Sequence, residues 1–226
     1  MTVPLEHGSR TTIHVYPDDD LHSSIEKCTE YTDLMVHGTH VLHRTLQIST
    51  HNTRIIGIDD ISTTPQITFT NDWYAVDISA DNVELHNLTI TGEMGAMSNA
   101  PGTVISACTF LTKHVCINVF GVDATIINND LQCIVNGNGV GRTGVSAQCN
   151  DRTIITGNTI RNVAKGVSLN DTAHRCCVIS NTFVRCSYGI FRGHHELNPE
   201  TLESVHATLN ACNQFVDVAV AVHTCS

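Results

Sequence analysis

The sequence predicts an all-β solenoid, in which short coils of backbone stack along one axis. The first observation is a repeat over residues 155–191, where two copies of one unit follow each other at a spacing of 23 residues. Aligning Asn158 with Asn181 also aligns Ile160 with Phe183. Repeats of this length are typical of stacked, quasi-one-dimensional folds.

The second observation is that three positions of the unit stay apolar in four successive copies. They are Ile105, Ile126, Ile155 and Val178, then Phe110, Leu131, Ile160 and Phe183, then Ile117, Val145, Val167 and Ile190. A small residue precedes each member of the last group: Cys116, Gly144, Gly166 and Gly189. The match predicts that each group forms one column of a shared core.

The third observation is that no unit contains a run with the periodicity of a helix. Each unit has short β-branched runs separated by Asn, Gly and Asp, so the coils are predicted to consist of strands. Neighbouring coils would then pair in parallel at about 4.8 Å. At this spacing, Asn129, Asn158 and Asn181 are predicted to form an internal asparagine ladder.

With these residues the chain resembles the right-handed parallel β-helix, or pectin-lyase-like, superfamily over roughly residues 33–224. The resemblance implies a single-stranded right-handed parallel β-helix, and the handedness also agrees with the general chirality of parallel crossovers. We expect residues 1–32 to form an N-terminal strand and a short capping helix. Residues 33–226 would form the β-helix, with one domain overall.

The N-terminal segment has the pattern of a strand followed by a helix. Residues 11–16 alternate like a strand that Pro17 ends, and Asp18 or Asp19 is the expected N-cap of the helix. The apolar face of this helix would consist of Leu21, Ile25 and Cys28. Because the end of a solenoid exposes strand edges and core, we expect this helix to act as a cap.

Three polar or glycine-rich segments are predicted to be loops that interrupt the stack. They are residues 92–102, 136–143 and 193–201. Insertions in solenoids often build a binding surface on one face. If the three loops lie on the same face, we expect that face to be the functional one.

Composition excludes several classes of protein. The net charge of −10 argues against a general nucleic-acid binder, and no apolar run reaches the length of a membrane span. The first ten residues lack the basic start and apolar stretch of a secretory signal. We therefore expect a chain that is made in the cytoplasm and that, as a particle component, would end in a virion.

Ten cysteines in such a chain are expected to be mainly buried thiols. Cys108, Cys116 and Cys186 fall on core columns. Disulfides are an alternative, and so is a zinc site built from His174, Cys176, Cys177 and Cys186. Because this set lacks a paired Cys-x-x-Cys, we expect no metal and no cofactor.

Basic residues are concentrated in one part of the chain. Residues 142–192 hold seven of the twelve basic residues and two acids, a local charge of +5, which leaves −15 elsewhere. The repeat places Asp123 under Arg152, and Arg152 under Arg175. These three residues form either a surface salt-bridge ladder or an anion clamp for an acidic sugar.

In the clamp alternative, Arg192 is a further anion-binding candidate. The register also places Asp151 beneath His174, and either residue could transfer a proton. The catalytic candidates are therefore Asp151, His174, Arg152 and Arg175.

The resemblance implies several enzyme activities, but the sequence departs from their signatures. Pectate and alginate lyases of this type have a calcium-binding acid cluster, whereas the acids here are scattered. Polygalacturonases have paired acids on consecutive coils, which this chain lacks. Residues 188–190, with His194 and His195, resemble a mannuronan epimerase segment, but Phe191 and Arg192 stand in place of its essential Asp.

A second resemblance is to β-helix proteins of viral tails and capsid surfaces. Residues 177–190 are similar to an adenoviral coil of the form Cys-x4-Asn/Cys-x-Phe-x2-Cys-x2-Gly-Ile. The sequence thus favours a non-enzymatic particle component that forms a homotrimer and contacts other particle proteins. The alternative is a lyase, epimerase, hydrolase or lectin that acts on acidic polysaccharide.

Overall fold

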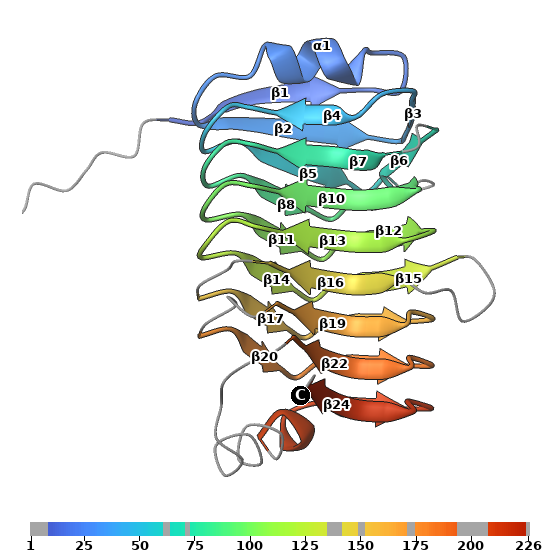
Figure 1. Ribbon diagram of the computed structural model, residues 1–226. Coiled ribbons are helices and arrows are strands. Elements are labelled where there is room, and N and C mark those ends of the chain that lie inside the picture. The colour runs from blue at the N-terminus through green and yellow to red at the C-terminus, as the bar shows by residue number, and fades with distance from the viewer. Residues whose placement is uncertain are drawn as a thin grey trace, which may run out of the picture.

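The chain folds as a right-handed parallel β-helix, as the sequence predicts (Figure 1). A computed structural model describes residues 9–60, 64–70, 73–134, 142–148, 152–170, 175–193 and 208–224. Coils stack from the N-terminal helix at one end to the last strand at the other. Within the described residues, each coil supplies one strand to each of three parallel sheets, here named A, B and C.

The strands follow one another in the chain in the order A, B, C. Sheet A contains β1 (Thr11–Val15), β2 (Thr32–His37), β5 (Arg54–Ile58), β8 (Glu84–His86), β11 (Val104–Ser106), β14 (Thr125–Ile127), β17 (Ile154–Thr156) and β20 (Cys177–Ile179). Sheet B contains β3 (Thr39–Leu42), β6 (Gln66–Phe69), β9 (Thr89–Gly92), β12 (Thr109–Thr112), β15 (Asp130–Cys133), β18 (Thr159–Arg161), β21 (Thr182–Val184) and β23 (Gln214–Val216). Sheet C contains β4 (Leu46–Ile48), β7 (Tyr74–Ile78), β10 (Met94–Ser98), β13 (Val115–Val119), β16 (Thr143–Ala147), β19 (Lys165–Leu169), β22 (Tyr188–Arg192) and β24 (Val220–Thr224).

The observed register confirms the columns that the repeat predicts. Ile126 pairs with Ile155 in sheet A, Ile160 with Phe183 in sheet B, and Val167 with Ile190 in sheet C. The side chains of all twelve column residues are buried in the core that runs inside the coils. Near the C-terminus the spacing lengthens to 32 residues, because Phe183 pairs with Phe215.

Left-handed backbone marks the corners between sheets. At the corner that leads into sheet A, the residue two positions before the paired strand segment has positive φ seven times in succession. These residues are Tyr31, which follows α1, and Asn52, Asn82, Gly102, Asp123, Arg152 and Arg175, which follow strands of sheet C. This conformation is uncommon outside glycine and asparagine. The geometry of the stack therefore imposes it on two arginines.

The corner from sheet A to sheet B holds an asparagine ladder. The backbone N–H of Asn129 donates to Oδ1 of Asn158 at 2.9 Å, and that of Asn158 donates to Oδ1 of Asn181 at 3.0 Å. Each side-chain amide also donates to a carbonyl of the preceding coil, as Asn158 Nδ2 does to Ile126 O at 2.9 Å. Asn213 extends the ladder by one coil, because its Oδ1 accepts from Asn181 N.

The N-terminal helix α1 (Leu21–Glu26) covers the first coil (Figure 1). The predicted N-caps were wrong: the cap is Asp20, whose side chain accepts from His22 N. The Asp19 carboxylate instead accepts from Tyr16 N and belongs to the preceding turn. The predicted apolar face is confirmed, since its three residues Leu21, Ile25 and Cys28 are buried.

The prediction of a loop over residues 92–102 was wrong, because β10 forms a regular strand of sheet C there. Its Gly95 faces inward, and a Cβ on it would lie 2.5 Å from Cδ1 of Phe110 and 2.1 Å from the Cys116 carbonyl oxygen. The packing of the core therefore requires a glycine at position 95. The other two predicted loops lie almost entirely outside the described residues. Among the helices that the structure describes, none has the length and apolar character to cross a bilayer.

Candidate functional site

Asp123, Arg152 and Arg175 lie in one column at the corner from sheet C to sheet A. The Arg152 guanidinium binds the Asp123 carboxylate through two hydrogen bonds, Nε to Oδ1 and Nη2 to Oδ2, both 2.5 Å long. Such a bidentate pair uses the two faces that an external carboxylate would need. Asp123 therefore occupies one of the two edges of the Arg152 guanidinium that can bind a carboxylate through two hydrogen bonds.

The contact between Arg152 and Asp123 also affects the pKa of Asp123 and the net charge of this column. The hydrogen bond from Arg152 lowers the pKa of Asp123, and the charge of Arg175 lowers it further. One carboxylate and two guanidinium groups leave a net charge of +1. Both bonded side chains are about half exposed, 50% for Arg152 and 46% for Asp123, so water and salt screen the interaction.

The remaining candidates of the predicted site are not brought together by the described structure. Asp151 and His174 lie outside the described residues. Arg192 ends β22 in sheet C, in register with Leu169, which is buried. Its Nε is buried without a hydrogen-bond partner among the described residues, and burial lowers its pKa.

The described cysteines have free thiols, and most of them fill the core. Burial raises the pKa of Cys108 to about 12 and that of Cys186 to about 11. The alternative zinc set is divided by the fold, because Cys186 lies before β22 whereas Cys176 and Cys177 lie at the start of β20. The described residues contain no cluster of three metal-ligating side chains.

A feature that the sequence prediction missed is the outer surface of sheet A between β11 and β20. Eight outward residues there carry no charge, and we call them the apolar face: Val104, Ser106, Thr125, Ile127, Ile154, Thr156, Cys177 and Ile179. Ile154 and Ile179 are 42% and 39% exposed. By contrast, the first coils of the same sheet carry Asp33, Arg54 and Glu84 on their outer surface.

Polar corners border the apolar face, and a groove extends it. On one side lies the Asp123–Arg152–Arg175 column, and on the other lie Asn128 and Ser180. A groove of about 270 Å³ adjoins its last coil, lined by Arg175, Cys176, Cys177, Val178, Ile179, Thr208, Leu209 and Cys212. An uncharged centre with a polar rim is the usual arrangement of a protein interface.

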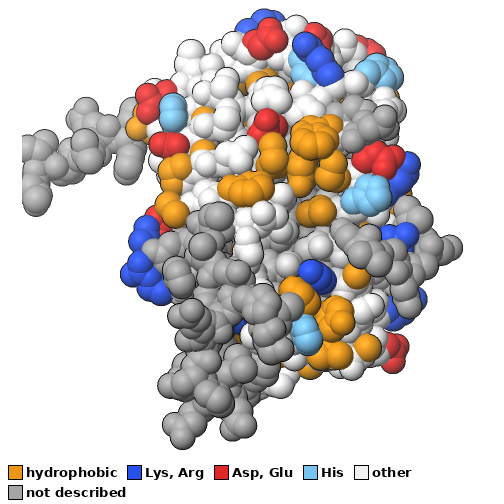
Figure 2. All heavy atoms as spheres, in the orientation of Figure 1, with side chains coloured by type: hydrophobic (Ala, Val, Ile, Leu, Met, Phe, Trp, Pro, Cys, Tyr) orange, Lys and Arg blue, Asp and Glu red, His pale blue; other side chains and the backbone are white. Residues whose placement is uncertain are grey.

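The outer surface of sheet C faces the viewer in Figure 2 and also carries hydrophobic side chains. Met94, Met97 and Val115 are half-buried there, and Trp73 is exposed. Farther along the sheet, the Lys165 ammonium lies 3.6 Å from the centroid of the Phe191 ring. A groove of about 270 Å³ surrounds this pair, lined by Ser146, Gln148, Lys165, Ser168, Leu169, Asn170, Phe191 and Gly193.

Comparison with known proteins supports the fold. No family model matches the sequence, and a comparison with curated proteins gave no significant match. An alginate lyase from Paenibacillus sp. str. FPU-7 matches in structure with a TM-score of 0.64 and 12% identity, over 82% of this chain and 75% of the lyase. The pectate lyase Pel9A matches with a TM-score of 0.60 and 11% identity, over 84% of this chain.

The chain spans only 56% of that pectate lyase. The Dettilon tailspike protein (gp208) matches with a TM-score of 0.47 and 14% identity, over 80% of this chain and 46% of the tailspike chain, and we base no argument on it. Identities this low establish a common fold alone. The chain is a right-handed parallel β-helix with the fold of pectate and alginate lyases.

Proposed function

We propose that this protein is a non-enzymatic structural β-helix, which assembles as a homotrimer into a viral particle or onto its capsid surface. The observation that carries the proposal is the apolar face of sheet A. Four consecutive coils expose only uncharged side chains there, and Ile154 and Ile179 lie near its centre and end. Burying such a surface against another protein is favourable by about 25 cal/mol per Å² of apolar area.

Charge favours a second copy of this chain as the occupant. The half of the apolar face on β17 and β20 lies within residues 142–192, which carry +5, while the rest of the chain carries −15. In a two-fold dimer whose axis runs across the coils, the basic margin formed by Arg152 and Arg175 would face an identical margin. In a closed ring, each basic margin faces a different surface of its neighbour, so attraction to acidic residues becomes available.

The test is the molar mass of a double variant, Ile154→Asp with Ile179→Asp, measured by size-exclusion chromatography with light scattering. Two carboxylates at the centre of the contact would have to be desolvated, so we expect the trimer to dissociate to monomers. The matched control is Val41→Asp, which places the same charge on a valine of sheet B that is 57% exposed. A double variant that keeps the wild-type mass would refute the use of this face.

A second function, binding of acidic polysaccharide, is supported by the Lys165 groove. The groove combines an aromatic ring, a cation and the amides of Gln148 and Asn170, which together suit a carboxylated sugar. In this alternative, Lys165→Gln would weaken binding to pectate or alginate at least tenfold. New absorbance from unsaturated uronate products would indicate a lyase.

The earlier clamp hypothesis is tested beside it by the double variant Arg152→Ala with Arg175→Ala. Because Asp123 already binds Arg152, we expect this variant to bind acidic sugar as the wild type does. A loss of binding would assign the anion site to this column instead.

A further inference from the structure

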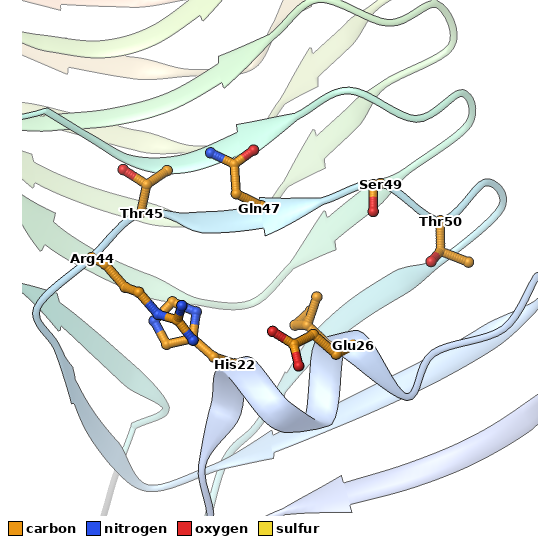
Figure 3. A pocket seen from close by; sticks show the side chains of 8 residues that line it. His22, Glu26, Arg44, Thr45, Gln47, Ser49 and Thr50 are labelled. Carbon is orange, nitrogen blue, oxygen red and sulfur yellow. The ribbon is translucent and has the colours of Figure 1, made fainter.

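A groove lies between α1 and β4 at the N-terminal end of the stack (Figure 3). Its volume is about 440 Å³, within the range of small-molecule sites. The lining residues are His22, Ile25, Glu26, Arg44, Thr45, Gln47, Ser49 and Thr50. All but one of these side chains are polar, so the groove is suited to a ligand that forms hydrogen bonds.

The two fully charged side chains of this groove have opposite signs and are not paired with each other. Within the described residues, neither Arg44 nor Glu26 forms an ion pair or a side-chain hydrogen bond. Figure 3 shows Arg44 reaching from the start of β4 toward the His22 ring, while Glu26 lies one helical turn farther along α1. Residues four apart on a helix are about 6 Å apart at Cβ, which separates the positive and negative ends of the groove.

The imidazole at the positive end is also unsatisfied. The Nε2 atom of His22 is buried and has no hydrogen-bond partner among the described residues. Burial lowers the pKa of His22, and the charge of Arg44 lowers it further, which favours the neutral ring. Buried polar atoms are normally hydrogen-bonded, and an unpaired one beside an unpaired guanidinium fits a site that is completed by a ligand.

Two uncharged side chains on β4 and in the turn after it add unused hydrogen-bonding groups. The amide of Gln47 and the hydroxyl of Ser49 have no partner among the described side chains and backbone groups. Thr50 is less available, because its hydroxyl donates to Cys28 O. The groove thus offers a cation, an anion and neutral groups between them.

We infer that this groove binds a small zwitterion, an α-amino acid or a dipeptide, with its carboxylate on Arg44 and its ammonium group on Glu26. Both side chains are exposed and therefore hydrated in the free protein; a simple anion would pair with Arg44 alone, and a simple cation with Glu26 alone. A zwitterion satisfies both and adds no net charge to the groove. Gln47 and Ser49 would then bind the polar atoms of the ligand between its charged ends.

The test uses L-glutamine as the probe and saturation-transfer NMR titration of the full chain as the measurement. N-acetyl-L-glutamine lacks the ammonium group, and L-glutaminamide lacks the carboxylate. We expect each to bind at least tenfold more weakly than L-glutamine. In Arg44→Gln, L-glutamine and L-glutaminamide should bind equally, because the partner of the carboxylate is lost. In Glu26→Gln, L-glutamine and N-acetyl-L-glutamine should bind equally, because the partner of the ammonium group is lost.

Two controls keep the experiment decisive. Arg161→Gln removes a charge on sheet B, far from the groove, and should leave the titration unchanged. Thermal melts establish that the groove variants are folded, which we expect because the side chains of Glu26 and Arg44 are both exposed. Absence of L-glutamine binding, equal binding of N-acetyl-L-glutamine, or glucuronate binding in its place would overturn the inference.

Discussion

The amide of Asn158 shows how one side chain joins three coils. It is buried, its Oδ1 accepts from the backbone of Asn129, and its Nδ2 donates to Ile126 O and to Asn181 Oδ1. Asparagine suits this position because its amide has both donors and acceptors. The corner backbone would otherwise hold buried N–H and C=O groups without partners.

Replacing this residue should therefore destabilise the protein substantially. Asn158→Ala leaves buried polar groups of two neighbouring coils unpaired, and we expect a loss of about 2–4 kcal/mol in the free energy of unfolding. Urea denaturation measures it. Asn99→Ala, at an exposed position, is the control and should change the free energy by less than about 0.5 kcal/mol. Equal effects would mean that the ladder does not stabilise the stack.

The buried thiols predict how stability depends on alkaline pH. In the folded state the pKa is about 12 for Cys108 and about 11 for Cys186, against an ordinary value of 9.0. Above pH 9 the unfolded chain loses these protons while the folded chain keeps them, so stability falls as pH rises. Each thiol should cost about 1.4 kcal/mol at pH 10.

The check is the slope of the unfolding free energy between pH 8 and 10.5. The double variant Cys108→Ala with Cys186→Ala should be less stable at pH 8, because it leaves cavities, and its slope should be smaller. An unchanged slope would show that these two thiols titrate alike in both states.

Among the secondary-structure elements, strand β10 could not be predicted from its own sequence. The columns through Ile155 and Ile160 could be predicted, because large apolar residues repeat there. The β10 segment is rich in Gly, Ala and Met, which individually favour loops or helices. Only the neighbouring coil, with the ring of Phe110 against Gly95, explains why a strand forms there.

Enlarging that glycine should test this explanation. Gly95→Ala places a methyl group against Phe110 and the Cys116 carbonyl, and we expect about 1–3 kcal/mol of destabilisation. Chemical denaturation gives the value, with Met97→Ala on the outward side of the same strand as the control. A stabilised Gly95→Ala variant would be incompatible with the close packing described here.

Two successive inward residues in β22 also explain why site residues were harder to predict than the fold. In β22, Gly189 faces inward against Phe215, and the next residue, Ile190, is also buried. Two successive inward residues break the alternation of a strand and reverse the side on which later residues lie. Arg192 was therefore grouped with a surface clamp, although its Nε is buried.

A similar ambiguity affected the apolar face. Ile154 and Ile155 are adjacent, as are Val178 and Ile179, and an apolar pair of this kind predicts a strand that is buried on both sides. In the structure, one member of each pair is buried and the other is exposed. The signal for the apolar face was thus present in the sequence, but only the register shows that Ile154 and Ile179 point outward.

At the scale of the whole molecule, the stack separates structural and surface roles. Residues that point inward form one continuous core, while each outer surface has its own chemistry: uncharged on part of sheet A, and aromatic and cationic on part of sheet C. A column of left-handed corner residues places charges between these surfaces. Self-association through sheet A and ligand binding beneath α1 use separate surfaces and can be tested independently.

The molar mass of the unmodified protein at sedimentation equilibrium tests the proposed assembly most directly. The account predicts a species of about 74 kDa, three times the chain mass of 24.6 kDa, that persists as the protein is diluted through the micromolar range. A single species of 24.6 kDa at every concentration would contradict it.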